Sequence, residues 1–502
     1  MRERLPRWIA ATLLACVALG APPLPCFAQA GVAGLGHIDD ATTVPRGLFR
    51  LRGISAWSRF DERFTTNGPL SLGASLTADS LGVRQVPQLA SIQSLVESAT
   101  GRPFTLTLGR SRLGATAREE VVPIGFDYGV TSRLTISFVA PVVRRRVASL
   151  FRLDTTGSAA NVGPNPMRFV NSAVLANTRV QNEFDLAANQ LEARIAACTT
   201  NPGATGCSGI AGRQTQAQQL VQSSRAFAAD LAALYGGPTS LGSAFVPIAQ
   251  TSAQDSIAAR VASFNTQYKD FLATSTNLLQ AVPAAAAGPA GPAYFEGYYT
   301  SELGRDSLNL QERIGIGDVE FGFKLGVIDR PRTASRRTGV QMAVASSVRL
   351  PSGSRQQRSG IADLRIGGGS VVVDSRVAVD ARAGRAGLLA VGGFATSVRD
   401  NDTTNSALRS SRWTDIQLAP RWHFAEALSL HGAYSLRSSD KDGGDQLLGG
   451  GVTYSTLSAH ESGGHSLPME MRFTHLEAVR GDAGRPKFFR DQIEVRLYFR
   501  LR

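Results

Sequence analysis

The chain has 502 residues, of which 43% are hydrophobic and 19% are charged, and its formal net charge at pH 7 is +13. Beyond residue 30 no run of about 18 apolar residues occurs, which excludes a transmembrane helix by the usual length rule. A soluble secreted enzyme and a membrane β-barrel are the classes that remain.

Residues 1–30 have the pattern of a secretory signal peptide. Arg2, Arg4 and Arg7 precede an apolar run, and Ala28–Ala30 matches a cleavage site with small residues. The segment Leu13–Cys16 resembles a lipobox, which makes a lipoprotein the alternative. Removal of residues 1–30 takes away three arginines and one glutamate, so the net charge of the exported chain falls from +13 to +11.

Polar and apolar residues then alternate over 47–60, 104–130 and 132–150. Side chains of a strand point alternately to its two faces, so this pattern predicts strands with one dry face and one wet face. The third stretch illustrates it, because Leu134, Ile136 and Phe138 alternate with Arg133, Thr135 and Ser137.

Residues 151–310 follow a different period. From Ile257 to Leu278 the apolar residues recur at alternating intervals of four and three, which predicts a helix. The stretches around Phe184 and Phe227 predict two more helices. This part of the chain is therefore expected to be a three-helix insertion.

The cysteines of the exported chain lie within this insertion. Cys16 and Cys26 leave with the signal, while Cys198 and Cys207 bracket a turn between the first two predicted helices. Since exported proteins meet an oxidising compartment, we expect a disulfide here rather than a metal site or a nucleophile.

The strand pattern returns after residue 310 and continues to the end of the chain. In the last stretch, DQIEVRLYFRLR at 491–502, every odd position from 493 to 501 is apolar. With the three earlier strands the total is twelve, an even number. The expected strands are 311–328, 337–351, 361–382, 386–400, 411–425, 427–438, 446–458, 467–480 and 488–501.

The lengths of the links distinguish a barrel from a soluble sandwich, which would show the same alternation. Links after even-numbered strands are short, whereas those after odd-numbered strands include 61–103 and 151–310. Outer-membrane barrels show this asymmetry, with short periplasmic turns and longer outside loops. We therefore predict an all-β membrane barrel, an up-and-down antiparallel transmembrane barrel of about twelve strands. Both termini would be periplasmic and the three-helix subdomain extracellular. The expected divisions are 1–30, 31–150, 151–310 and 311–502.

Charged residues on the polar faces are candidates for the lumen. They could line a pore whose charges act on a passing solute, or they could pair across neighbouring strands and fill a narrow barrel. The main candidates are Asp318, Glu320, Lys324, Arg349, Asp415, Arg421, His423, His431, Arg437, Glu494, Arg496 and Arg500, with Arg50, Arg52, Asp363, Arg365, Arg376, Asp380, Arg382, Glu470 and Arg472.

The sequence gives little support for an enzymatic site or a metal site. The sequence has no Gly-x-Ser-x-Gly motif, and His431 with Ser429 and Ser435 is the nearest arrangement to a nucleophile and base. The stretch HESGGH at 460–465 lacks the spacing of a helical zinc motif. We expect neither an enzyme, nor a metal or cofactor, nor a nucleic-acid partner. For the basic charge of an exported protein, outer-membrane lipid and lipopolysaccharide are better anionic partners.

Three stretches resemble a known family. YGVTSRLTISFVAPVV at 128–143, GIGDVEFGFKLGV at 315–327 and SSVRLPSG at 346–353 are similar to the transporter-like outer-membrane barrels of the "MetA-pathway of phenol degradation". The resemblance implies a channel for small aromatic or other hydrophobic solutes, and it transfers no binding residue. The alternative function is a plugged surface barrel that acts as a scaffold or binding module through its helical insertion.

Overall fold

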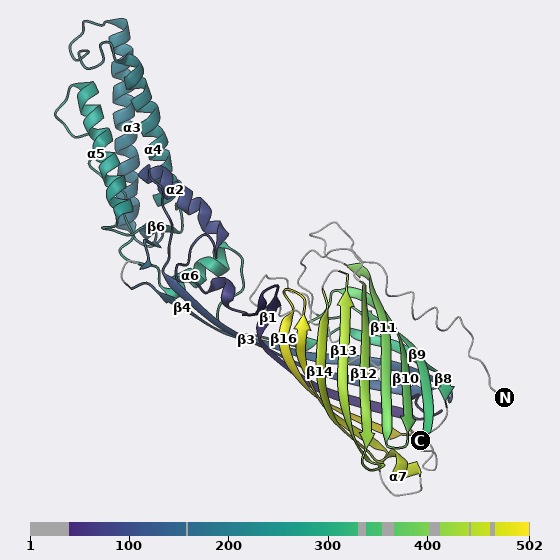
Figure 1. Ribbon diagram of the computed structural model, residues 1–502. Helices are drawn as coiled ribbons and strands as arrows, with labels where there is room; N and C mark the ends of the chain where they lie inside the picture. Colours follow the sequence, from purple (N-terminus) through teal and green to yellow (C-terminus); the bar gives the residue numbers. More distant parts are fainter. Residues whose placement is uncertain are drawn as a thin grey trace.

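The computed structural model describes residues 40–156, 159–329, 338–353, 366–400, 412–440, 443–461 and 467–500. Figure 1 shows a β-barrel and an elongated helical arm that projects from one end of it. The barrel has twelve antiparallel strands and is closed, because its first strand, β1, pairs with its last, β16. The expected signal peptide lies outside the described residues.

Strands β7 and β8 pair one after the other with β4, so together they occupy one of the twelve strand positions in the barrel wall. The remaining strands pair in chain order, which is an up-and-down arrangement. The strands of the wall are β1 Phe49–Thr65, β3 Arg110–Gly129, β4 Leu134–Asp154, β7 Gln311–Ile316, β8 Val319–Asp329, β9 Thr338–Leu350, β10 Ser370–Ala383, β11 Ala386–Asp400, β12 Arg412–His423, β13 Leu428–Ser439, β14 Asp445–Ser455, β15 Met469–Gly481 and β16 Pro486–Phe499.

The predicted twelve strands are confirmed, but two of them differ in detail. The strand expected at 311–328 is interrupted at Gly317 and Asp318. There the Asp318 carboxylate accepts the backbone N–H groups of Gly353 at 3.0 Å and Gly368 at 2.5 Å. The strand expected at 361–382 begins only at Ser370, after a bend rich in glycine, and residues 361–365 lie outside the described residues.

The two ends of the barrel differ. At the end that we call the turn end, the links 130–133, 384–385 and 424–427 are short, and β1 begins there beside the last residue of β16. At the opposite loop end, the links 66–109 and 155–310 are long. Strands β3 and β4 continue beyond the barrel at this end and lead into the helical arm (Figure 1).

The helical arm contains the three predicted helices and two that we did not predict, α2 and the short α6, whose Phe295 is buried in the same core. The longer of these two, α2, comes from the link after β1, and its buried residues Ile92, Val96 and Ala99 join the same core as those of the other helices. The helix expected to reach Leu278 ends earlier, at Leu272. The described helices are α2 Ala90–Thr100, α3 Asn171–Thr200, α4 Gln214–Tyr235, α5 Ser252–Leu272, α6 Pro292–Gly297 and α7 Leu457–Glu461, and the short strands are β2 Gly68–Ser71, β5 Val162–Pro164 and β6 Phe245–Pro247.

The core of the arm is apolar and aromatic. Phe184 of α3, Phe227 of α4 and Phe264 of α5 form three ring contacts, with centroids 5.2 to 5.9 Å apart. Burial of large aromatic side chains is a strong stabilising contribution. The arm therefore has a hydrophobic core of its own, separate from the interior of the barrel.

A disulfide joins Cys198 at the end of α3 to Cys207 in the following turn. Because a cross-link restricts the unfolded chain, replacing both cysteines with serine should lower the free energy of unfolding of the arm by about 2–3 kcal/mol. The measurement is urea unfolding followed by the helical circular dichroism signal. Gel mobility of the unboiled barrel should not change, and a loss of that mobility would contradict a purely local role.

Glu183 connects α3 to the segment after α5. Its carboxylate accepts the backbone N–H groups of Gln280 at 2.7 Å and Ala281 at 2.8 Å, and a bond from Arg179 at 2.7 Å. Burial alone would raise the pKa of Glu183, but these donors outweigh it and hold the pKa below its ordinary value of 4.5.

A depressed pKa makes the stabilisation sensitive to acid. The contribution of Glu183 is complete above its unfolded pKa and is lost as the pH falls through the folded value. The variant Glu183→Gln should therefore unfold at a lower temperature than the wild type at pH 7, and the difference should shrink below about pH 4. Thermal melts of the helical signal at several pH values measure this. A constant difference at all pH values would contradict it.

Candidate functional site

The inward faces of the strands carry charge, as the alternation predicts. In β3 and β16 buried and more accessible residues alternate, and Glu494 and Arg496 are each 2% exposed. Asp318, Glu320, Lys324, Asp415 and His431 are buried as well, whereas Arg349, Arg421, His423 and Arg437 are half-buried, and Arg500 is exposed beyond the end of β16. Asp363 and Arg365 lie outside the described residues.

Many of these charged side chains form ion pairs between strands on the inner face of the barrel. The distance from a guanidinium nitrogen to a carboxylate oxygen is 3.2 Å between Arg349 and Glu320 and 3.2 Å between Arg421 and Asp380. Arg376 of β10 reaches across β11 to Asp415 of β12 at 3.1 Å. This last pair has room because the intervening residue on β11 is Gly393, where a Cβ atom would collide with the Asp415 carboxylate.

Another group of buried charges lies near the turn end. Asp127 of β3 is 0% exposed and pairs with two arginines of β1, Arg50 at 2.7 Å and Arg52 at 3.8 Å. Asp127 belongs to a strand that we predicted, and its position between Phe126 and Tyr128 would have placed it on the polar face by the same alternation.

The segment that precedes β1, residues 40–48, lies inside the barrel at the turn end. Asp40 is 3% exposed and pairs with Lys324 of β8 at 3.2 Å and with Arg496 of β16. The backbone N–H of Val44 donates to Thr135 Oγ1 of β4 at 2.8 Å. This segment, which we call the N-terminal latch, therefore contacts three separate parts of the inner wall. No strand pattern marks Asp40, so it was not predicted as a lumen residue.

The inner wall also has apolar patches. Ala41 of the N-terminal latch packs against Ala343, Ala378, Leu389 and Val391, on β9 to β11. A second patch joins β1, β3 and β4 to the bend before β10, and its members are Ile54, Ala56, Val121, Val143 and Ile366. The inner wall thus contains buried apolar as well as charged side chains.

The outward faces of the barrel are apolar on many strands. Phe126 of β3 is 48% exposed, Phe321 of β8 49%, Trp422 of β12 49% and Phe473 of β15 44%. Soluble monomers rarely expose a continuous apolar surface of this kind. The observation favours a lipid-facing wall over the soluble sandwich that the alternation also allowed.

Aromatic residues gather on this wall near the turn end. The ring centroid of Phe49 lies 4.6 Å from that of Tyr128 and 6.1 Å from that of Phe499. The ring centroid of Phe138 lies 5.0 Å from that of Phe321. Phe49, Tyr128, Phe138 and Phe321 border a shallow apolar groove of about 290 Å³. Aromatic girdles at the membrane–water boundary are typical of transmembrane barrels. In the part of the chain that the structure describes, none of the helices combines the length and the apolar character required to cross a bilayer.

Comparisons with known proteins give only distant likenesses. An outer membrane channel from Pseudomonas putida F1 is 11% identical, with 92% of this chain and 98% of that chain covered and a TM-score of 0.40. The toluene transporter TbuX from Ralstonia pickettii is 9% identical, with coverages of 91% and 90% and a TM-score of 0.29. The translocator domain of the autotransporter NalP from Neisseria meningitidis is 6% identical, with coverages of 93% and 91% and a TM-score of 0.31.

No protein-family model matches the chain, and the search of curated proteins finds no match. Likenesses at this level do not assign a function to the chain.

The geometry around His431 does not form a nucleophile and base. Its Nε2 atom lies 3.1 Å from Thr474 Oγ1, and its Nδ1 atom 3.5 Å from Thr453 Oγ1. Within the described ranges, no hydrogen bond joins this histidine to Ser429 or Ser435, although a nucleophilic serine needs such a bond. Of HESGGH, only His460 and Glu461 are described, in α7. The described residues contain no group of three metal-ligating side chains.

Proposed function

We propose that the protein is an outer-membrane channel for small hydrophobic or aromatic solutes. The observation that carries the proposal is the division between the two faces of one closed sheet, apolar outside and charged inside. A closed sheet leaves no unpaired strand edge in the hydrocarbon, which is the condition for crossing a bilayer with strands. We place both termini in the periplasm and the helical arm outside the cell.

The apolar patches of the inner wall support the solute class. A purely charged lumen would favour ions or polar solutes, whereas the inner wall also has apolar patches such as Ile54 with Val121 and Ala343 with Val391, which Ile366 and Ala41 cover in this structure. The test is uptake of small aromatic compounds into liposomes that contain the purified protein, with planar-bilayer conductance as a second readout. A membrane that stays sealed to ions and aromatics under all conditions, and with the variants proposed below, would count against a channel.

A scaffold function is the second candidate. Paired charges occupy much of the inner wall, and the arm projects far from the barrel (Figure 1). Deletion of residues 160–300, which removes every helix of the arm except α2, separates the two functions. A channel should keep or increase its permeability after the deletion, whereas a scaffold should lose only the binding of its partner.

A further inference from the structure

Three arginines lie side by side on the outward face of the barrel, close to the loop end. Arg59 of β1 is the register partner of Arg118 of β3, and Arg118 is the register partner of Arg146 of β4. Directly opposed residues of antiparallel strands have their Cβ atoms about 5 Å apart on the same face. We call these three residues the arginine row.

No ion pair within the described residues neutralises the arginine row, although Glu312 of β7 is the register partner of Arg146 and stands at the end of the row, where its carboxylate pairs with Arg144 instead. Among the residues that the structure describes, none of the three forms an ion pair, and the Nε atom of Arg146 is buried without a hydrogen-bond partner. Arg144, one step towards the turn end, differs, because it pairs with Glu120 at 3.5 Å and with Glu312 at 2.7 Å. Like charges directly opposite each other destabilise a sheet, so the row is suited to an anion supplied from outside.

The level of the row on the wall indicates where that anion lies. Two residues towards the turn end on β1 stands Trp57, which is 40% exposed, and beyond it the neighbouring strands present Val122 and Val142. Val122 and Val142 lie four residues from Arg118 and Arg146, so the arginines stand about 13 Å above the apolar wall, with Trp57, Glu120 and Arg144 at the level between. A tryptophan followed by arginines is the order expected across a membrane–water boundary.

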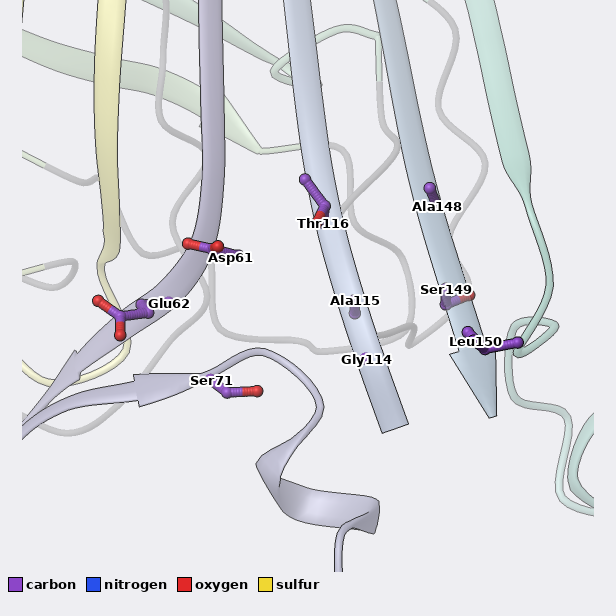
Figure 2. A pocket seen from close by; sticks show the side chains of 9 residues that line it. All are labelled: Asp61, Glu62, Ser71, Gly114, Ala115, Thr116, Ala148, Ser149 and Leu150. Atoms are coloured by element: carbon purple, nitrogen blue, oxygen red, sulfur yellow. The ribbon is translucent and has the colours of Figure 1, made fainter. Parts of the chain in front are cut away.

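An open groove of about 520 Å³ adjoins the row on its other side (Figure 2). Its floor is formed by the small residues Gly114, Thr116 and Ala148, and Thr116 and Ala148 follow Arg118 and Arg146 on the same outward face. Polar groups border it, including the Asp61 carboxylate and the Ser71 hydroxyl. A carboxylate can accept hydrogen bonds from sugar hydroxyls, and a serine hydroxyl can both donate to them and accept from them.

We propose that this surface binds a phosphorylated glycolipid of the outer leaflet. The arginine row holds the phosphate, the groove holds the sugar, and the acyl chains run down the apolar wall past Trp57. Charge-assisted bonds from several guanidinium groups to one phosphate are among the strongest hydrogen bonds in proteins. They compensate for the nearby carboxylates of Asp61, Glu62, Glu120 and Glu312, of which Glu62 pairs with Lys487. The inference rests on the proposed membrane location but is independent of conduction through the lumen.

The test uses the full-length protein in nanodiscs of phosphatidylcholine. Binding of a purified phosphorylated glycolipid, of its dephosphorylated form and of inorganic phosphate is compared for the wild type and for Arg118→Gln, the centre of the row. We expect the wild type to prefer the phosphorylated glycolipid at least tenfold over the dephosphorylated form, and Arg118→Gln to lose most of that preference. Binding should weaken as salt is added.

The matched control is Arg112→Gln with Arg152→Gln. These two arginines are also opposed on the outward faces of β3 and β4, but they lie beyond the groove. The control variant should bind like the wild type, and unboiled gel mobility checks that every variant has a closed barrel. Equal affinity for both glycolipid forms, an equal loss in the control variant, or inorganic phosphate binding as tightly as the glycolipid would each overturn the proposal.

Conductance in phosphatidylcholine alone separates this inference from the proposed function. A protein that conducts but shows no preference for the phosphorylated glycolipid retains its channel function and refutes the site. A protein that binds the glycolipid through the arginine row but never conducts supports the site and refutes the channel.

Discussion

Replacing Asp40 with alanine is expected to increase the conductance of the barrel severalfold. The Asp40 carboxylate is the charged anchor of the N-terminal latch, through its pairs with Lys324 and Arg496. Breaking a buried ion pair typically costs about 3–5 kcal/mol, and each 1.4 kcal/mol changes an equilibrium constant about tenfold. Loss of the anchor should therefore shift the latch strongly towards release from the inner wall. Single-channel recording in planar bilayers measures the result.

Two further variants test whether the N-terminal latch restricts the pore. Lys324→Met removes the partner of Asp40 on β8 and should open the channel in the same direction. Asp79→Ala removes an exposed carboxylate outside the barrel, which lies 3.6 Å from Arg110, and should leave the conductance unchanged. If both Asp40→Ala and Lys324→Met conduct like the wild type while their barrels stay closed, the latch does not control the pore.

Replacing Asp127 with leucine should lower the stability of the barrel by about 3–5 kcal/mol. The side chain of Asp127 is 0% exposed, and its removal leaves the guanidinium groups of Arg50 and Arg52, each 1% exposed, without their buried carboxylate. The loss of a partner is costly because a buried charge cannot regain its hydration. The temperature at which the detergent-solubilised barrel loses its compact gel mobility measures the change.

An exposed ion pair provides the control for Asp127→Leu. Glu120→Gln breaks the pair with Arg144, in which both side chains are more than 40% exposed, and exposed pairs contribute at most about 1 kcal/mol. Replacing Asp127, Arg50 and Arg52 together with apolar residues should restore much of the stability, since neither arginine is then left buried without the Asp127 carboxylate. A triple variant as unstable as Asp127→Leu would contradict this explanation.

The barrel could be predicted from the sequence because alternation is a local signal. Each predicted strand needed only its own residues, and the twelve strands follow from repeating that test along the chain. The break at Gly317 and Asp318 was not predictable in this way, because Asp318 leaves the ladder to bind Gly353 and Gly368, which are distant in sequence. Helix α2 was missed although Ile92, Val96 and Ala99 have helical spacing.

The lumen was predictable in part. Alternation selects the residues that face inward, such as Glu320 and Arg496, but not the partners that they meet. A pair such as Arg376 with Asp415 depends on the tilt of three strands and on the absence of a side chain at Gly393. Asp40 belongs to no strand, so only the structure places it among the lumen charges.

The closure of the sheet by β1 and β16 has a consequence for how the molecule is made. Phe49 is the register partner of Phe499, so the pairing joins segments separated by nearly the whole chain. Contacts between distant segments form slowly, whereas helical hairpins form from near neighbours. The arm can therefore mature early, whereas the ring of strands can be completed only after β16 is available to pair with β1.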